Sequence, residues 1–348
     1  MWYTAEQDSG GFKKSIGYAV SSNGTEWTSH PSNPLLAVDP TGWDQDSIAS
    51  QVIVWDPIDT QYIMAYQGFT VGGTWGLGIA TSPDGVSWTK SAQNPALNFN
   101  DYSYTEDDLW SYFCNDFVED RTICDYYGIS YSSSYEPVVG VQPCWPLTIT
   151  ISDRGLLRGY IAGTDTRRAI ETAFDWAQLE ADLWAELTTG AEVSLNTSDE
   201  PAACQVYAMD GVDANTWYID ENAPVLPSTE TYDASGIASA AVVEYTDEET
   251  QDKKLYMFYV GFEEWVIYDS YQSSSKQTLN LATSTDGGVT WQKDPNNPIP
   301  INLTTPGQIS DIGAQVIGKR IHIWVTDVYG SSSAVGYFYY EPGIDPHP

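Results

Sequence analysis

The chain has 348 residues, with 48 acidic and 14 basic side chains and a formal net charge of −34 at pH 7. Nucleic acid and anionic membrane surfaces are therefore unfavourable partners, because a protein that binds phosphates needs Lys or Arg to neutralise them. The sequence contains no apolar run of roughly 18 residues, so we expect no membrane span.

A repeated unit of strand, tight turn, tryptophan and Asn-Pro pair is the main organising feature of the sequence. Three clear copies and a weaker fourth span residues 16–36, 75–97, 279–299 and 206–226. Small and apolar residues alternate in each copy, as in a half-buried strand, and a turn containing Gly follows. Proline then ends the unit, since it cannot donate a hydrogen bond to a neighbouring strand.

Further strands precede these copies. Short apolar strands rich in aromatic residues occupy residues 1–4, 62–66, 157–161, 255–259 and 321–325, and earlier strands occupy 48–54, 237–243 and 312–317. Four-stranded units that recur every 40–60 residues or so are typical of a β-propeller. Five aromatic second strands predict an all-β, five-bladed β-propeller. The alternative is a β-sandwich, but sandwiches do not repeat such a unit.

The prediction places residues 1–348 in a single propeller domain. The expected blades cover residues 1–36 (without a first strand), 37–97, 98–235, 236–301 and 309–342 (three strands). The first unit begins inside a blade pattern, so we expect upstream sequence to be absent from this chain. Residues 98–235 form an irregular third blade with a large insertion that carries the cysteines.

The insertion also contains one predicted helix. Asp165-Thr166 would cap it, its apolar residues recur at helical spacing up to about Leu187, and Gly190 follows. Since the rest of the chain reads as strands, we expect this helix to pack across one face of the propeller.

The four cysteines are Cys114, Cys124, Cys144 and Cys204. None forms a CxxC pair and the chain has only three His, which argues against zinc. An even number of cysteines favours two disulfides and an exported protein, extracellular or periplasmic; buried free thiols are the alternative, and the three pairings stay open. No cofactor is predicted: carboxylates could hold Ca²⁺ at a central funnel, but no spacing argues for it.

One run of residues carries a family resemblance. It comprises Met1-Trp2-Tyr3-Thr4, Ile16-Gly17-Tyr18-Ala19, Gly24, Trp27, Asn33-Pro34-Leu35-Leu36 and Gly42-Trp43-Asp44. It resembles the five-bladed propellers of the arabinanase, levansucrase and invertase superfamily, which includes glycoside hydrolase families 43, 32 and 68. The resemblance is strong over residues 1–97 and 236–342 and weak between them. It is specific for the fold rather than for an activity.

The segment Ser284–Trp291 also resembles the Asp-box of sialidase propellers. That resemblance implies a structural turn, with Asp286 bonded to the backbone and Trp291 packed in the blade, and the same reading applies to Asp84 and Trp88. A sialidase would also need a cluster of Arg, and this chain has only six. Sialidase activity therefore ranks low.

Hydrolysis of a glycosidic bond needs two carboxyl groups that flank it. The resemblance implies that they project into a central funnel from the innermost strands, with a third acidic group beside them. Candidates near the starts of predicted innermost strands are Asp44, Asp46, Glu136, Asp233 and Asp311. Some of these would precede strands by chance in so acidic a chain, or would cap turns. The family's Asp-Pro signature is absent, with Ser50-Gln51 at the equivalent place, and the innermost strand of blade one, which carries the base in the family, is missing.

Three functions therefore compete. The first is an exported glycoside hydrolase that acts on a polysaccharide or oligosaccharide through two of these carboxylates. The second is a non-catalytic propeller that binds glycan or protein, with Trp43, Trp110 and Trp145 stacking on sugar faces unless they serve ordinary packing. The third is a structural module of a larger surface protein. Oligomeric state is not predicted.

Overall fold

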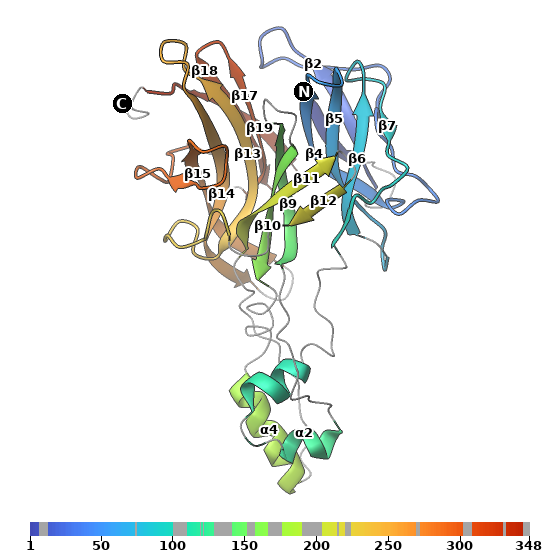
Figure 1. Ribbon diagram of the computed structural model, residues 1–348, viewed down its shortest axis with the longest axis vertical. Helices are drawn as coiled ribbons and strands as arrows, with labels where there is room; N and C mark the ends of the chain where they lie inside the picture. The colour runs from blue at the N-terminus through green and yellow to red at the C-terminus, as the bar shows by residue number, and fades with distance from the viewer. Residues whose placement is uncertain are drawn as a thin grey trace.

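The computed structural model describes most of the chain. The described residues are 1–6, 13–73, 75–99, 110–118, 120, 122–128, 141–151, 157–165, 176–189, 204–213, 216–219, 224–268, 272–301, 308–329 and 332–343. Strands dominate, as predicted, and they gather into one body with a small helical lobe beyond one end of it (Figure 1). In this part of the chain, no helix is long and apolar enough to cross a membrane.

The described strands form five antiparallel sheets, numbered here in chain order. The first is β1 (Trp2–Glu6), β2 (Lys14–Val20) and β3 (Thr28–Ser29); the second is β4 (Ser47–Asp56), β5 (Gln61–Phe69), β6 (Trp75–Ser82) and β7 (Thr89–Lys90), with β8 (Leu97–Asn98) also pairing with β6. The third is β9 (Val141–Ile151), β10 (Leu157–Asp165), β11 (Gln205–Asp213) and β12 (Thr216–Ile219). The fourth is β13 (Gly236–Thr246), β14 (Lys253–Tyr268), β15 (Gln272–Ser284) and β16 (Gln292–Lys293), and the fifth is β17 (Gln308–Ile317), β18 (Arg320–Tyr329) and β19 (Ser332–Tyr340).

Both faces of the middle sheets are apolar, because each sheet is covered on two sides. Successive side chains of a strand point to opposite faces. Thus Ile161 of β10 packs with Ile79 of the second sheet, whereas its neighbour Tyr160 packs with Tyr259 of the fourth. Four buried clusters of this kind join the first sheet to the second, the second to the third, the third to the fourth and the fourth to the fifth.

The innermost strands of four sheets lie side by side. Strand β4 lies against β9, β9 against β13 and β13 against β17. Among the described strands, the first sheet has no innermost strand of this kind. Its first strand, β1, pairs only with β2.

The turns of the repeated unit connect neighbouring sheets. An aromatic side chain on one sheet donates to a glycine carbonyl in the turn of another: Trp2 Nε1 to Gly85 (2.9 Å) and the Tyr160 hydroxyl to Gly288 (3.4 Å). Trp324 Nε1 of the fifth sheet donates to Gly24 of the first in the same way, at 3.4 Å. The last sheet is therefore connected to the first.

An aspartate side chain holds each of two turns by hydrogen bonds to the backbone. Asp286 accepts hydrogen bonds from the backbone N–H groups of Val289 and Thr290 (3.1 and 3.0 Å), and Asp84 does the same for Val86 and Ser87. The prediction that these aspartates serve the turn is confirmed. The Thr290 hydroxyl also donates to Asp286 Oδ2 at 2.6 Å, and this bond, followed by the backbone bond of Thr290, lowers the pKa of Asp286 to about 2.

The asparagine of each Asn-Pro pair ends the repeated unit by making the two backbone hydrogen bonds that a neighbouring strand would make. Asn94 accepts from the N–H of Ile79 (2.8 Å) and donates to its carbonyl (2.9 Å), and the following peptide bond to Pro95 is cis. Asn33 makes the same two bonds to Tyr18, and Asn297 makes them to Leu281, each again before a cis proline. A carboxamide suits this place because it is both donor and acceptor.

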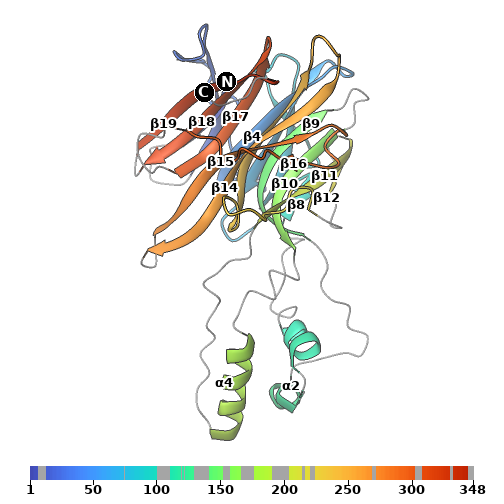
Figure 2. The same cartoon turned by 90° about the vertical axis from the view of Figure 1, so that its left-hand side faces the viewer.

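The helices form a lobe of their own, which corrects the predicted placement of the helix. Helix α4 (Trp176–Thr189) exists, but Asp165, the predicted cap, ends β10, and residues 166–175 lie outside the described part. The buried stripe of α4 packs on the π-helix η2 (Phe113–Phe117) and on α2 (Thr122–Tyr127), not across a sheet (Figures 1 and 2). The helical spacing of the apolar residues predicts that one face of α4 is buried, but not which element covers that face.

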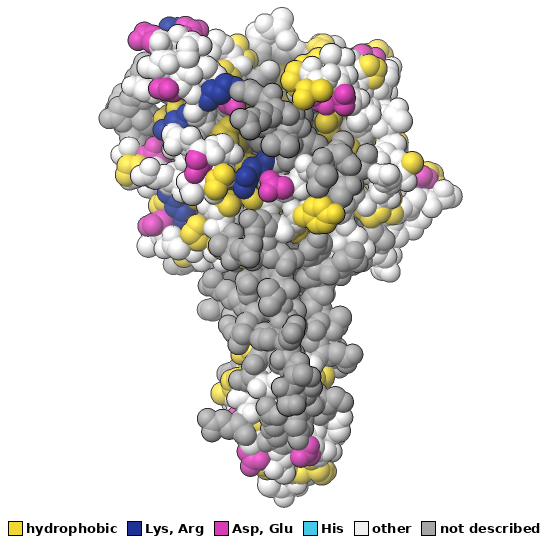
Figure 3. All heavy atoms as spheres, in the orientation of Figure 1, with side chains coloured by type: hydrophobic (Ala, Val, Ile, Leu, Met, Phe, Trp, Pro, Cys, Tyr) yellow, Lys and Arg dark blue, Asp and Glu magenta, His cyan; other side chains and the backbone are white. Residues whose placement is uncertain are grey.

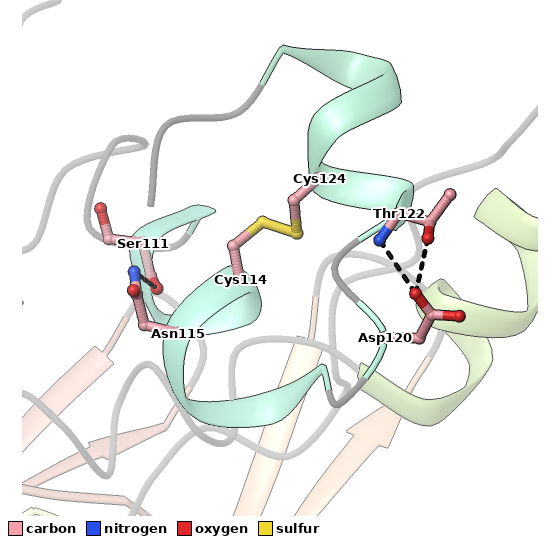
Figure 4. Close-up of a disulfide and its surroundings, with 6 residues drawn as sticks. All are labelled: Ser111, Cys114, Asn115, Asp120, Thr122 and Cys124. Carbon is pink, nitrogen blue, oxygen red and sulfur yellow. Dashed lines mark hydrogen bonds between the residues drawn. A yellow bond between two sulfur atoms is a disulfide. The ribbon is translucent and has the colours of Figure 1, made fainter. Parts of the chain in front are cut away.

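The lobe contains a disulfide between Cys114 and Cys124, which joins η2 to α2 (Figure 4). Cys204 is disulfide-bonded as well. Pairing of the cysteines is therefore confirmed at these positions, and the free-thiol alternative is wrong for them.

Candidate functional site

Two of the predicted carboxylates occupy equivalent places in two sheets. Asp44 lies three residues before β4, and Asp233 lies three residues before β13. Both are fully buried, with 1% and 0% of their surface exposed. Each place is the point where the chain enters the innermost strand of its sheet.

Three donors surround each of these carboxylates. Asp44 Oδ2 lies 2.7 Å from Lys90 Nζ and accepts from the Tyr66 hydroxyl at 3.1 Å, and its Oδ1 accepts from the N–H of Asp39 at 3.3 Å.

Asp233 repeats the pattern. Lys293 Nζ lies 2.6 Å from its Oδ2, the Tyr259 hydroxyl 3.1 Å from the same oxygen, and the N–H of Glu230 2.9 Å from Oδ1. We call each set, with its Asp, Tyr and Lys, a buried anchor.

The buried anchors hold their tyrosines neutral. Burial raises the pKa of Tyr66 and Tyr259 far above the ordinary value, and the adjacent Asp44 and Asp233 charges raise it further. Both hydroxyls therefore stay protonated and donate to the carboxylates at all ordinary pH values. Removal of one partner from such a buried ion pair would leave an uncompensated buried charge, which is strongly destabilising.

Sequence reasoning missed the partners of these aspartates, although the repeats contain a signal for them. The second and fourth sheets share Met-x-Tyr-x-Gly in their second strand, at residues 64–68 and 257–261, and Trp-x-Lys after the turn, at 88–90 and 291–293. The first sheet keeps the tyrosine, Tyr3, but has Ser29 at the place of the lysine. Aligning the copies position by position would have paired each Asp with its Lys.

Asp46 has a different environment from Asp44. Its side chain is only partly buried, and Oδ2 accepts from the N–H of Val71 at 2.8 Å, in an exposed loop between β5 and β6. The Asp46 N–H donates to the carbonyl of Phe69, the last residue of β5. Asp46 is thus a carboxylate near the beginning of an innermost strand that remains open to solvent.

The other predicted site residues are dispersed. Asp311 lies in β17 opposite Thr326, next to an irregularity in strand pairing, and Trp145 lies in β9 opposite Ala162. Glu136 lies outside the described residues. Trp110 packs edge-on against Phe113 in the helical lobe, with ring centroids 6.0 Å apart.

Trp43 is half-buried and lies beside the first anchor. Its ring stacks on Tyr66 with centroids 6.0 Å apart, and its carbonyl accepts from the Thr70 hydroxyl at 2.6 Å. A side chain at Gly68 or Gly78 would collide with this ring, so both glycines make room for it. Trp43 therefore packs within the second sheet while part of its surface faces solvent.

The innermost strands are irregular near their beginnings. Pairing shifts between Ala49 and Val52 in β4, and equivalent shifts occur in β13 and β17. Ser50 has φ of 52°, a left-handed conformation that is strained for a residue with a side chain. Next to it, Gln51 accepts a hydrogen bond from Thr4 of β1 at 2.8 Å. The bulge thus turns the Gln51 amide toward the first sheet.

Metal ligands do not converge in the part of the chain that the structure describes. No group of three His, Cys, Asp or Glu side chains there is placed to hold a metal ion. The buried anchors use lysine as the counter-charge for each aspartate instead.

Comparisons with known proteins show similarity in fold only. No protein-family model matches the chain, and no curated protein matches it. Among solved structures, a thermostable family-43 glycoside hydrolase superposes with a TM-score of 0.53 at 12% identity, covering 100% of this chain and 93% of that one. A glycosyl hydrolase from Bacteroides ovatus gives 0.53 at 14% identity, covering 98% and 80%. An N-acetylgalactosamine deacetylase from F. plautii, in complex with blood group B trisaccharide, gives 0.51 at 14%, covering 98% and 85%.

Proposed function

We propose that the chain is a five-bladed β-propeller that hydrolyses glycosidic bonds in a polysaccharide or oligosaccharide. The observation that carries the proposal is the likeness in fold, over the whole chain, to carbohydrate-active enzymes, two of them glycoside hydrolases. Five sheets in sequence, with Trp324 of the last bonded to Gly24 of the first, support the five-bladed ring. Ligands of such propellers lie where the innermost strands meet.

The catalytic carboxylates that we propose are Asp46 and Asp311. Both lie near the beginning of an innermost strand, and β4 and β17 belong to the same inner group of strands. Asp46 is partly exposed and accepts a hydrogen bond from the backbone N–H of Val71, a position that suits a base or nucleophile. Asp311 would then be the acid, and Glu136 the third acidic group.

Asp44 and Asp233, in contrast, serve the fold in this proposal. A general acid or base must reach the scissile bond, and these two carboxylates are buried with three donors each. Trp43, beside the first anchor and partly exposed, is the residue that we propose for stacking on a sugar ring, with Trp145 on β9 as the second. Trp110 stabilises the helical lobe.

A non-catalytic propeller that binds carbohydrate is the second candidate. Ser50-Gln51, at the bulge of β4, favours it, because these two residues stand at the place of the family's Asp-Pro signature and supply no carboxylate there. Amides and aromatic rings hold sugars without cleaving them. The disulfides are compatible with export in either case, because they persist in oxidising compartments.

The test is release of reducing sugar from arabinan, xylan, fructan and algal polysaccharides by the purified protein and by three variants. We expect one substrate to be cleaved, and Asp46→Asn and Asp311→Asn each to lower the rate at least about 100-fold. Asp59→Asn, an exposed carboxylate in the turn between β4 and β5, is the matched control and should keep full activity. Binding of a polysaccharide without any cleavage would favour the second candidate.

A further inference from the structure

One face of the fifth sheet is uncovered. The opposite face, with Ile321, Ile323 and Val325 of β18, packs in the core against the fourth sheet. The uncovered face turns toward the first sheet, and Trp324 Nε1 donates to the Gly24 carbonyl across the junction. No buried apolar cluster joins these two sheets among the described residues, in contrast to the four other junctions.

This uncovered face is aromatic. Pairing of the strands places Tyr337 opposite Trp324 and Tyr339 opposite His322, so all four rings share the face. Tyr337 and Tyr339 are 42% and 49% exposed. Isolated exposed rings need no explanation, but neighbouring ones on one flat sheet are a feature of binding surfaces.

The rings form a row with an open end. Trp324, His322 and Tyr337 lie with centroids 5.7–6.2 Å apart and with planes inclined by 25–41°. Beyond Trp324 the row stops, because its partner on β17 is Gly313. A Cβ built on Gly313 would find no atom within 4 Å, so the space beside the indole is open.

Polar groups border this open space. Gln315 is exposed on β17 opposite His322, and the His322 Nδ1 atom lies 2.6 Å from the Tyr337 hydroxyl. Arg320, over the Tyr339 ring at 4.2 Å, forms an ion pair with Glu341. Arg320 thus neutralises Glu341 at this end of the face, although the whole chain has a net charge of −34.

We propose that the uncovered face of β17, β18 and β19 is a second carbohydrate-binding surface, which takes an uncharged polysaccharide chain. A sugar ring would lie over Gly313 against Trp324 and Tyr337, with Gln315 and His322 hydrogen-bonding its hydroxyls. The ligand is uncharged because the face is neutral and an anionic chain would be repelled by the protein. The inference rests on the proposed function for the class of ligand, and its aromatic rings lie on β18 and β19, whereas the proposed acid Asp311 lies in β17.

The test measures binding of the full chain to neutral polysaccharides by affinity electrophoresis, beside an anionic polysaccharide. Gly313→Leu fills the open space without removing any aromatic ring, and its backbone is not in the left-handed region. We expect this variant and the double variant Tyr337→Ala/Tyr339→Ala each to weaken binding at least about tenfold. Tyr218→Ala removes a tyrosine that is 59% exposed on β12 and should bind as the wild type does.

Hydrolysis of a short oligosaccharide separates this inference from the proposed function. Asp46→Asn should abolish hydrolysis and still bind the polysaccharide, whereas Tyr337→Ala/Tyr339→Ala, on β19, should hydrolyse the short substrate normally and bind the long one weakly. Wild-type affinity in Gly313→Leu, or no retention of any neutral polysaccharide by the wild type, would overturn the inference whatever the enzyme assay shows. A change of molecular mass in Gly313→Leu by sedimentation would assign the face to contacts between copies, which also overturns it.

Discussion

Lys293 Nζ lies 2.6 Å from Asp233 Oδ2, and the two side chains are 13% and 0% exposed. The same pair recurs in the second sheet as Lys90 and Asp44, at 2.7 Å. In both sheets the pair fixes the loop before the innermost strand to the outermost strand, β7 or β16. Each anchor therefore ties the two edges of a sheet together at the end where the candidate carboxylates lie.

Loss of one partner of an anchor should destabilise the protein strongly. We expect Lys293→Met to lower the free energy of unfolding by about 3 kcal/mol, because it leaves Asp233 charged and buried. Urea unfolding followed by tryptophan fluorescence measures this. Lys319→Met is the control: its ion pair with Glu248 is exposed on both sides, and its loss should cost less than about 1 kcal/mol.

A double variant measures whether the Asp233 and Lys293 charges interact. In Asp233→Asn/Lys293→Met both charges are absent, so the protein should lose less stability than the two single variants added together. Strict additivity would mean that the pair is not coupled, in conflict with the structure.

The asparagines of the Asn-Pro pairs hydrogen-bond to a strand backbone, so replacing even one amide nitrogen by oxygen should lower the stability of the protein. Asn94→Asp removes the donor to the Ile79 carbonyl and to the Tyr66 hydroxyl, and we expect a loss of about 1–3 kcal/mol at neutral pH. Gln93→Glu, at the exposed neighbouring residue, adds the same charge without such partners and should change little. Equal unfolding midpoints for the two variants would contradict the role assigned to Asn94.

The turn aspartates should make stability depend on pH in the acidic range. The pKa of Asp286 in the folded protein is about 2, below its ordinary value of 3.8, so its contribution is complete above about pH 4 and is lost as the pH falls toward 2. Asp286→Asn keeps an acceptor but does not titrate. The difference in thermal midpoint between wild type and variant should therefore shrink between pH 5 and pH 2, and a constant difference would refute the linkage.

The disulfide should stabilise the helical lobe and leave the sheets unaffected. Cys114 and Cys124 enclose a short loop, for which chain entropy gives about 2–3 kcal/mol. The variant Cys114→Ser/Cys124→Ser should be cut by trypsin or chymotrypsin within the lobe faster than the wild type. Its main thermal transition, which reports the sheets, should stay within a few degrees, because the lobe packs around its own core of Phe113 and Trp176.

Local chemistry made much of the fold predictable. Alternating apolar residues, Asp-Gly turns and Asn-Pro pairs each act over a few residues, so the strands and the role of Asp286 followed from the sequence. The anchors act over longer distances: Asp44 and Lys90 are 46 residues apart, and Asp233 and Lys293 are 60 apart. An acidic residue before a strand is compatible both with a catalytic role and with a buried ion pair. Only the identity of its partner distinguishes the two. The helix was predictable for the same local reason, but its packing on η2 was not.

The most direct test of the account is reducing-sugar release by the folded wild-type protein and by Asp46→Asn, measured on the same polysaccharide. The account predicts release by the wild type and almost none by Asp46→Asn, with equal unfolding midpoints for both proteins. Release that persists in Asp46→Asn, or a wild type that binds the polysaccharide and never cleaves it, would contradict the assignment of a hydrolase with its base at the beginning of β4.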